Sequence, residues 1–91
     1  MVRVFVVYET EPDPARYEQH AELCRKVPGA TFRHGRVTRT LFGNELAYYA
    51  EFEFPDQESF QAVARGEEMA ATGKDAAEMG IPHSVYVTEV G

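Results

Sequence analysis

The order in which two sequence periods alternate is the strongest constraint on the fold of this chain. Four segments alternate with a period of two and are rich in β-branched and aromatic residues, namely 2–8, 31–41, 45–54 and 84–90. Such segments are typical of strands. Stretches that favour helices separate the first strand from the second and the third from the fourth. The sequence therefore predicts the element order βαββαβ.

Proline, glycine and aspartate mark the ends of the expected helices. Asp13 is placed to cap the first helix, with Pro14 as its first residue, and Pro28-Gly29 ends it near Val27. The second helix opens at Pro55-Asp56 and is expected to break near Gly66 or Gly73. An alanine-rich stretch over 75–79 follows, and a turn over 42–44 joins the middle strands into an antiparallel hairpin.

Connected by right-handed crossovers, this order is the ferredoxin-like α+β sandwich, a four-stranded antiparallel sheet with its helices on one face. No linker or internal repeat interrupts it, so we expect one domain over 1–91. Period-two counting assigns a nearly all-apolar face to the helices, made of Val4, Val6, Tyr8, Tyr48, Ala50, Phe52, Phe54, Val85 and Val87.

The opposite face of the expected sheet has no helix to cover it. It carries Phe5, Val7, Tyr49 and Tyr86, a larger aromatic patch than monomers usually expose. A chain of 91 residues also buries a modest fraction of its surface. Both arguments predict a homodimer formed through this open face of the sheet. The alternative is a solvated face with scattered apolar residues.

The formal net charge of −6 makes nucleic acid an unsuitable partner, because the surface repels phosphates. The apolar run over 4–8 is too short to span a bilayer or to act as a signal peptide. Cys24 is the only cysteine, which excludes an internal disulfide and a multi-cysteine zinc motif. We therefore expect a cytoplasmic protein with neither a membrane nor a nucleic-acid partner.

His20 lies near the centre of the apolar stripe of the first helix, a stripe formed by Tyr17, Ala21, Leu23, Cys24 and Val27. There it would face Tyr8 and Tyr48 of the sheet, giving an imidazole beside two phenols in an apolar cavity. Such a group is a candidate acid or base, with a tyrosine steadying an oxyanion. Alternatively, His20 is a core residue whose nitrogens are satisfied by a tyrosine hydroxyl and a backbone carbonyl.

The chain resembles the EthD-type family of the dimeric α+β barrel superfamily. The residues that carry this resemblance are the opening strand 2–8, His20 ahead of Lys26-Val27-Pro28-Gly29, then Gly35-Arg36-Val37, the segment 48–54 and the ending 85–90. Ala21-Glu22 follows the histidine where the family usually has Leu-Pro, and the first helix is about one turn short. The resemblance implies a homodimer with a small apolar pocket in each subunit and no bound cofactor.

Together these observations predict a protein that binds a small apolar or aromatic metabolite, with His20 transferring a proton. Tyr8, Tyr17, Tyr48 and Phe52 are the candidate substrate-binding residues. A non-catalytic accessory protein with the same pocket is the alternative, since a shared fold is weak support for shared chemistry.

Other titratable residues have ordinary explanations. His20 and Cys24 have a usable spacing for two metal ligands, but a third would have to come from His34 or Glu51, so we expect no metal. The basic run over 33–39 fits a solvated edge strand, although it could also meet an acidic ligand or a second copy's Glu51 and Glu53. His83 follows Pro82 in an expected surface turn.

Overall fold

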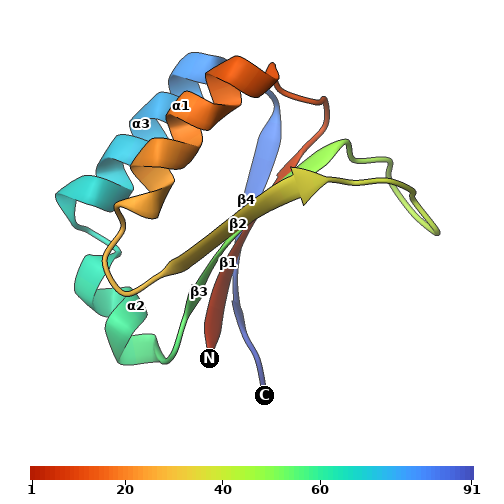
Figure 1. The fold of residues 1–91 in the computed structure, drawn as a ribbon. Coiled ribbons are helices and arrows are strands. Elements are labelled where there is room, and N and C mark those ends of the chain that lie inside the picture. Colours follow the sequence, from red (N-terminus) through yellow and green to blue (C-terminus); the bar gives the residue numbers. More distant parts are fainter.

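The computed structural model describes residues 1–91 and confirms the ferredoxin-like fold. The sheet has the order β2-β3-β1-β4 with antiparallel pairing throughout, and all helices lie on one face of it (Figure 1). The elements are β1 (Val2–Tyr8), α1 (Pro14–Arg25), β2 (Thr31–Arg36), β3 (Tyr48–Phe54), α2 (Gln57–Val63), α3 (Glu67–Met79) and β4 (His83–Glu89).

The predicted helix starts are confirmed by their capping contacts. The carboxylate of Asp13 accepts a hydrogen bond from the backbone N–H of Arg16 at 3.0 Å, and Asp56 caps α2 in the same way through Ser59 at 2.7 Å. The break in the second helical stretch lies just before α3, whose N-cap is Gly66. Gly73 instead lies inside α3, so the alanine-rich stretch belongs to one continuous helix.

The predicted hairpin between the middle strands is wrong at its turn. β2 ends at Arg36 rather than at residue 41, and β3 begins at Tyr48 rather than at residue 45. The N–H of Val37 donates to the carbonyl of Ala47 at 2.9 Å, but no backbone–backbone hydrogen bond joins residues 38–46. Alternation alone therefore did not make a strand, because the segment has no ladder partner. We call residues 38–46 the arm; it projects from the sheet (Figure 1).

The side of the sheet beneath the helices is the apolar side, as period-two counting predicts. Val4 pairs with Phe52 on one side and with Val87 on the other, which places all three on this face. Two buried clusters fill it, one around Phe54 and one around Tyr8. Val85 and Val87 depart from the prediction, because they are 55% and 56% exposed although they point to the helix side.

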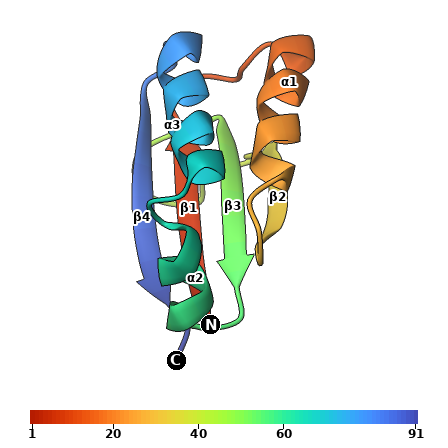
Figure 2. The same ribbon diagram turned by 90° about the vertical axis from the view of Figure 1, so that its left-hand side faces the viewer.

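The reason is visible in the way that the helices divide the sheet. Seen from the helix side, α1 lies over β2 and β3, whereas α3 lies over β1 and β4 (Figure 2). Most of the lining that the helices give to a cavity comes from α3, and this cavity extends to β4 at His83 and Val85. Val85 of β4 therefore lines a space rather than a core.

The open face carries a network of paired charges beside its apolar residues. Phe5, Val7 and Tyr49 are half-buried in the single chain, and Tyr86 is 55% exposed. Across the same face Glu53 accepts hydrogen bonds from Arg33 at 2.8 Å and Arg3 at 3.3 Å, while Glu51 lies within ion-pair distance of both arginines.

This network includes one residue of the basic run over 33–39. Arg33 pairs with Glu51 and Glu53 of its own chain, as expected of a charged edge strand. The run is also not continuous on one surface, because His34 points to the helix side and contacts the ring of Tyr17. None of the helices has the length and apolar character needed to cross a membrane.

Candidate functional site

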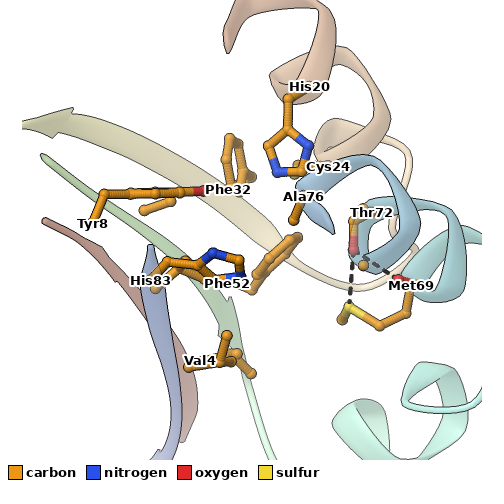
Figure 3. Close-up of a pocket in the computed structure, with 14 residues that line it drawn as sticks. Val4, Tyr8, His20, Cys24, Phe32, Phe52, Met69, Thr72, Ala76 and His83 are labelled. Atoms are coloured by element: carbon orange, nitrogen blue, oxygen red, sulfur yellow. Dashed lines mark hydrogen bonds between the residues drawn. The ribbon is translucent and has the colours of Figure 1, made fainter. Parts of the chain in front are cut away.

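The candidate site is an apolar cavity of about 200 Å³ between α3 and the sheet. Ten of its fourteen lining residues are hydrophobic, and the polar groups enter from different elements (Figure 3). The sheet contributes Val4, Val6, Tyr8, Phe32, Ala50, Phe52, His83 and Val85, and the helices contribute His20, Cys24, Met69, Thr72, Gly73 and Ala76. The hydroxyl of Thr72 is occupied within α3, since it donates to the carbonyl of Met69 at 2.7 Å.

His20 is 4% exposed and is held from behind by a carboxylate of α3. Its Nδ1 lies 2.8 Å from Oδ2 of Asp75. Arg16, one turn earlier in α1, donates to both oxygens of the same carboxylate at 2.7 and 3.1 Å. Asp75 therefore joins two residues of α1 to α3 and fixes the orientation of the imidazole.

The second ring nitrogen of His20 points toward Cys24. Nε2 lies 3.4 Å from Sγ of Cys24, which is one turn further along α1 and 1% exposed. Burial raises the pKa of this thiol to about 12. The thiol is thus protonated and can donate to Nε2, which leaves the hydrogen of Nδ1 for the carboxylate.

The hydrogen bonds that Asp75 accepts determine its protonation. The hydrogen bonds from Arg16, followed by that from His20, lower the pKa of Asp75, although its partial burial opposes this. Asp75 is therefore ionised at neutral pH. An ionised carboxylate accepts the Nδ1 hydrogen and would stabilise positive charge on the ring if Nε2 took a proton.

The tyrosines form an aromatic cluster beside the cavity. The hydroxyls of Tyr8 and Tyr17 are 3.1 Å apart, and the ring of Tyr17 packs against those of His20 and Tyr48 at 5.3 and 5.0 Å. Burial raises the pKa of both Tyr8 and Tyr17. Tyr48 is outside the lining, and its hydroxyl pairs with His34, whose pKa burial lowers. The phenols are therefore neutral.

His83 is the polar residue of the cavity that sequence reasoning placed wrongly. It begins β4, is half-buried and enters the cavity from the sheet, away from His20 on α1 (Figure 3). Nδ1 of His83 donates to the carbonyl of Ile81 at 2.7 Å, because a carbonyl can only accept. That bond fixes the tautomer and leaves Nε2 without a partner in the chain.

Of the candidate site residues, the structure brings His20, Tyr8 and Phe52 to the cavity and leaves Tyr17 and Tyr48 behind it. The expected partners of His20, a tyrosine hydroxyl and a backbone carbonyl, are replaced by Asp75 and Cys24. No group of three His, Cys, Asp or Glu residues is close enough to hold a metal ion.

Asp75 and Arg16 were missed, but a partial signal was available. Arg16, His20 and Cys24 recur every four residues and so share one stripe of α1. A buried imidazole with a cation one turn away on the same stripe indicates a carboxylate on the element that packs against the helix.

Solved structures of known proteins share this fold. An EthD (ethyl tert-butyl ether D) family protein from Bacillus halodurans is 27% identical with a TM-score of 0.79, over 100% of this chain and 99% of the other. A dimeric ferredoxin-like protein of unknown function from Jannaschia sp. is 22% identical with a TM-score of 0.74, over 98% of each chain.

SnoaB, a cofactor-independent oxygenase from Streptomyces nogalater, is 14% identical with a TM-score of 0.60, over 99% of this chain and 92% of its own. No family model and no curated protein matches the sequence. The chain thus resembles EthD-type proteins over its whole length, and its fold is shared with a wider set of ferredoxin-like proteins.

Proposed function

We propose that this chain is a single EthD-like domain of a cofactor-independent, cytoplasmic homodimer that binds a small apolar or aromatic metabolite. The observation that carries the proposal is the apolar cavity under α3, into which His20 and His83 both project. An apolar pocket with a small number of polar groups is typical of small-molecule sites. The resemblance to EthD-type proteins supports the same class of function.

The volume of the cavity indicates the size of the ligand. An engineered apolar cavity of about 150 Å³ is known to bind benzene, and this cavity measures about 200 Å³. A molecule with one aromatic ring and a short polar substituent therefore fits. A hydrogen-bond donor on that molecule would meet the unpartnered Nε2 of His83, whereas the hydroxyl of Thr72 already gives its hydrogen to the carbonyl of Met69.

His20 is the proposed proton-transfer residue. Its Nε2 would take a proton from an acidic C–H or O–H of the ligand, with the thiol of Cys24 giving way to the ligand, and Asp75 would stabilise the imidazolium. Return of that proton to another atom of the ligand completes an isomerisation or cyclisation without any oxidant or reductant. Tyr8 is the proposed positioning group, since its hydroxyl is held by Tyr17 and its ring lines the cavity.

A homodimer through the open face is part of the proposal. Several of the similar structures are described as dimeric ferredoxin-like proteins, from Jannaschia sp., Thermobifida fusca and Bacteroides fragilis. The open face of this chain carries Tyr86 at 55% exposure beside Phe5 and Val7, and no helix covers it. A second copy would remove these side chains from water.

A non-catalytic accessory protein is the second candidate. One observation favours it: both ring nitrogens of His20 already have partners in the empty site, Asp75 and Cys24. A satisfied imidazole can be a structural group that only shapes the pocket. In that case the protein would hold or deliver its ligand unchanged.

Deuterium exchange separates the two candidates without knowledge of the natural ligand. Phenylacetone has one aromatic ring and an acidic CH₂ group, so the protein is incubated with it in D₂O and the ketone is followed by mass spectrometry. If the protein is an enzyme, it should accelerate hydrogen–deuterium exchange of the ketone. That acceleration should be lost in His20→Ala and kept in Gln19→Ala, a variant of an exposed neighbour on α1.

Binding is measured separately by NMR titration with phenol, using toluene to test the need for a polar group. Binding of phenol with no exchange of phenylacetone would favour the accessory protein. No shift of any residue lining the cavity, with either ring compound, would reject the proposed pocket.

A further inference from the structure

The arm, residues 38–46, presents two large apolar side chains to solvent at its tip. Phe42 is 98% exposed and Leu41 is 83% exposed, the two highest values among the large hydrophobic residues of the chain. Gly43 follows with a φ of 94°, a conformation that places the two side chains at a sharp turn. Isolated exposed hydrophobic residues are common, but two at the end of a projecting loop are not explained by the fold of one chain.

The base of the arm is anchored while its outer part is not. Val37 and Ala47 are joined by a backbone hydrogen bond, and the N–H of Ala47 donates to the carbonyl of Tyr8 in β1. Beyond this point no backbone–backbone hydrogen bond is made until β3 begins. The arm therefore leaves the sheet at a fixed place, and no backbone hydrogen bond joins its tip to the rest of the chain.

The arm lies on the side of the sheet that the helices leave open. In Figure 1 it reaches away from α1 and α3, past the edge of the sheet, and in Figure 2, viewed from the helix side, it passes behind the strands. Any molecule docked on the open face would thus come within reach of the arm.

Charge favours a second copy of this chain as that molecule. The open face and the arm together carry three arginines (3, 33 and 39) and three glutamates (45, 51 and 53), so their formal charges cancel and the whole −6 lies elsewhere. A neutral, partly aromatic surface avoids the repulsion that two copies of an acidic protein would otherwise feel. Nucleic acid and strongly charged proteins are poor matches for it.

We propose that the arm is a clasp that closes over a second copy docked on the open face and buries Leu41 and Phe42 against it. The inference rests on the homodimer of the proposed function and adds the element that holds it. Two-fold symmetry makes the contact reciprocal, so each dimer has two clasps.

Sedimentation velocity over a concentration series tests the clasp. The double variant Leu41→Asp/Phe42→Asp should weaken self-association by roughly tenfold or more, because two buried side chains are lost. Ala62→Asp, an exposed position on α2, adds charge on the helix side and should leave the dimer intact. Equal weakening by both variants, or an unchanged dimer in the double variant, overturns the clasp.

The same concentration series tests the clasp and the homodimer as separate hypotheses. Tyr86→Asp on the open face should dissociate the protein whether or not the arm takes part. A dimer broken by Tyr86→Asp but not by the arm variant would refute the clasp alone, and a wild-type protein that stays monomeric would refute both. Phenol binding in the arm variant, followed by NMR, reports on the pocket independently.

A fluorescence measurement reports on burial of the tip directly. The chain contains no tryptophan, so Phe42→Trp introduces a single reporter. Its emission should be blue-shifted in the dimer and move to longer wavelength as dilution separates the subunits. Emission typical of a fully exposed indole at concentrations where sedimentation shows a dimer overturns the proposal.

Discussion

The two halves of the helix-side surface differ in how completely they are filled. Beneath α1 and α2, Val2, Val27 and Phe54 are at most 3% exposed and belong to one buried cluster. Beneath α3 only Thr72 of the helix is buried, and two valines of β4 remain more than half exposed. The same sandwich thus supplies stability in one half and space for a ligand in the other, and His20 lies at the boundary.

The largest contrast is expected from truncating an apolar side chain in each half. Phe54→Ala removes a side chain that is 0% exposed and packs against Phe60, so it should cost about 3–5 kcal/mol of unfolding free energy. Val87→Ala on β4 should cost less than about 1 kcal/mol, because that side chain is already half in water. Chemical denaturation of both variants measures the difference, and similar costs would mean that the halves are packed alike.

A smaller effect is expected at the junction of the two halves. Asp75→Asn keeps the shape but weakens the contacts to Arg16 and His20, so it should cost about 1–3 kcal/mol at neutral pH. The pKa of Asp75 is lowered in the folded state from its usual 3.8, so its contribution is complete above that value and is lost as the pH falls through the folded pKa.

Stability measured as a function of pH checks the sign of this effect. The wild type should lose stability below about pH 4 more steeply than the Asn variant, and the two curves should converge in acid. Parallel curves across that range would show that the carboxylate is not ionised more readily in the folded protein. The pH dependence of Asp56→Asn serves as a comparison for that of Asp75→Asn. Asp56 also has a lowered pKa, but it caps α2 at the surface instead of joining two helices.

Enlarging a side chain should change the free energy of unfolding in opposite directions in the two halves. Ala21 is 0% exposed within the filled half, so Ala21→Leu should cost about 1–3 kcal/mol through overpacking. Gly73 lies inside α3, and a methyl group built there would meet nothing within 4 Å. Gly73→Ala should therefore stabilise the protein by about 0.5–1 kcal/mol. Thermal unfolding of the two variants decides, and a loss of stability in Gly73→Ala would contradict an open space there.

Local signals in the sequence account for what could be predicted. The strand over 2–8 and the start of α1 at Pro14 followed from residue types that act on their immediate neighbours, and so did the cap of α2 at Asp56. The alternation over 37–41 and 45–47 misled because a strand also needs a partner, which is a property of the whole sheet. The position of His20 in a buried stripe was likewise readable from helical periodicity.

The site itself depends on contacts that no local pattern contains. Asp75 is 55 residues from His20 in the chain, and nothing near it distinguishes it from a solvated helix carboxylate. His83 was assigned to the surface because Pro82 precedes it, yet the pairing of β4 with β1 turns it toward the helices opposite Tyr8. The space under α3 depends on where that helix stands relative to the sheet, which the sequence pattern does not specify.

The burial of Cys24 gives the protein a built-in chemical reporter. It is the only cysteine, it is 1% exposed, and its thiol stays protonated, so a bulky thiol reagent can react only when the packing around the cavity opens. The labelling rate under native conditions would then measure how often that opening occurs. A ligand that fills the neighbouring cavity should slow the labelling, so occupancy could be followed without a chromophore and without knowing the reaction.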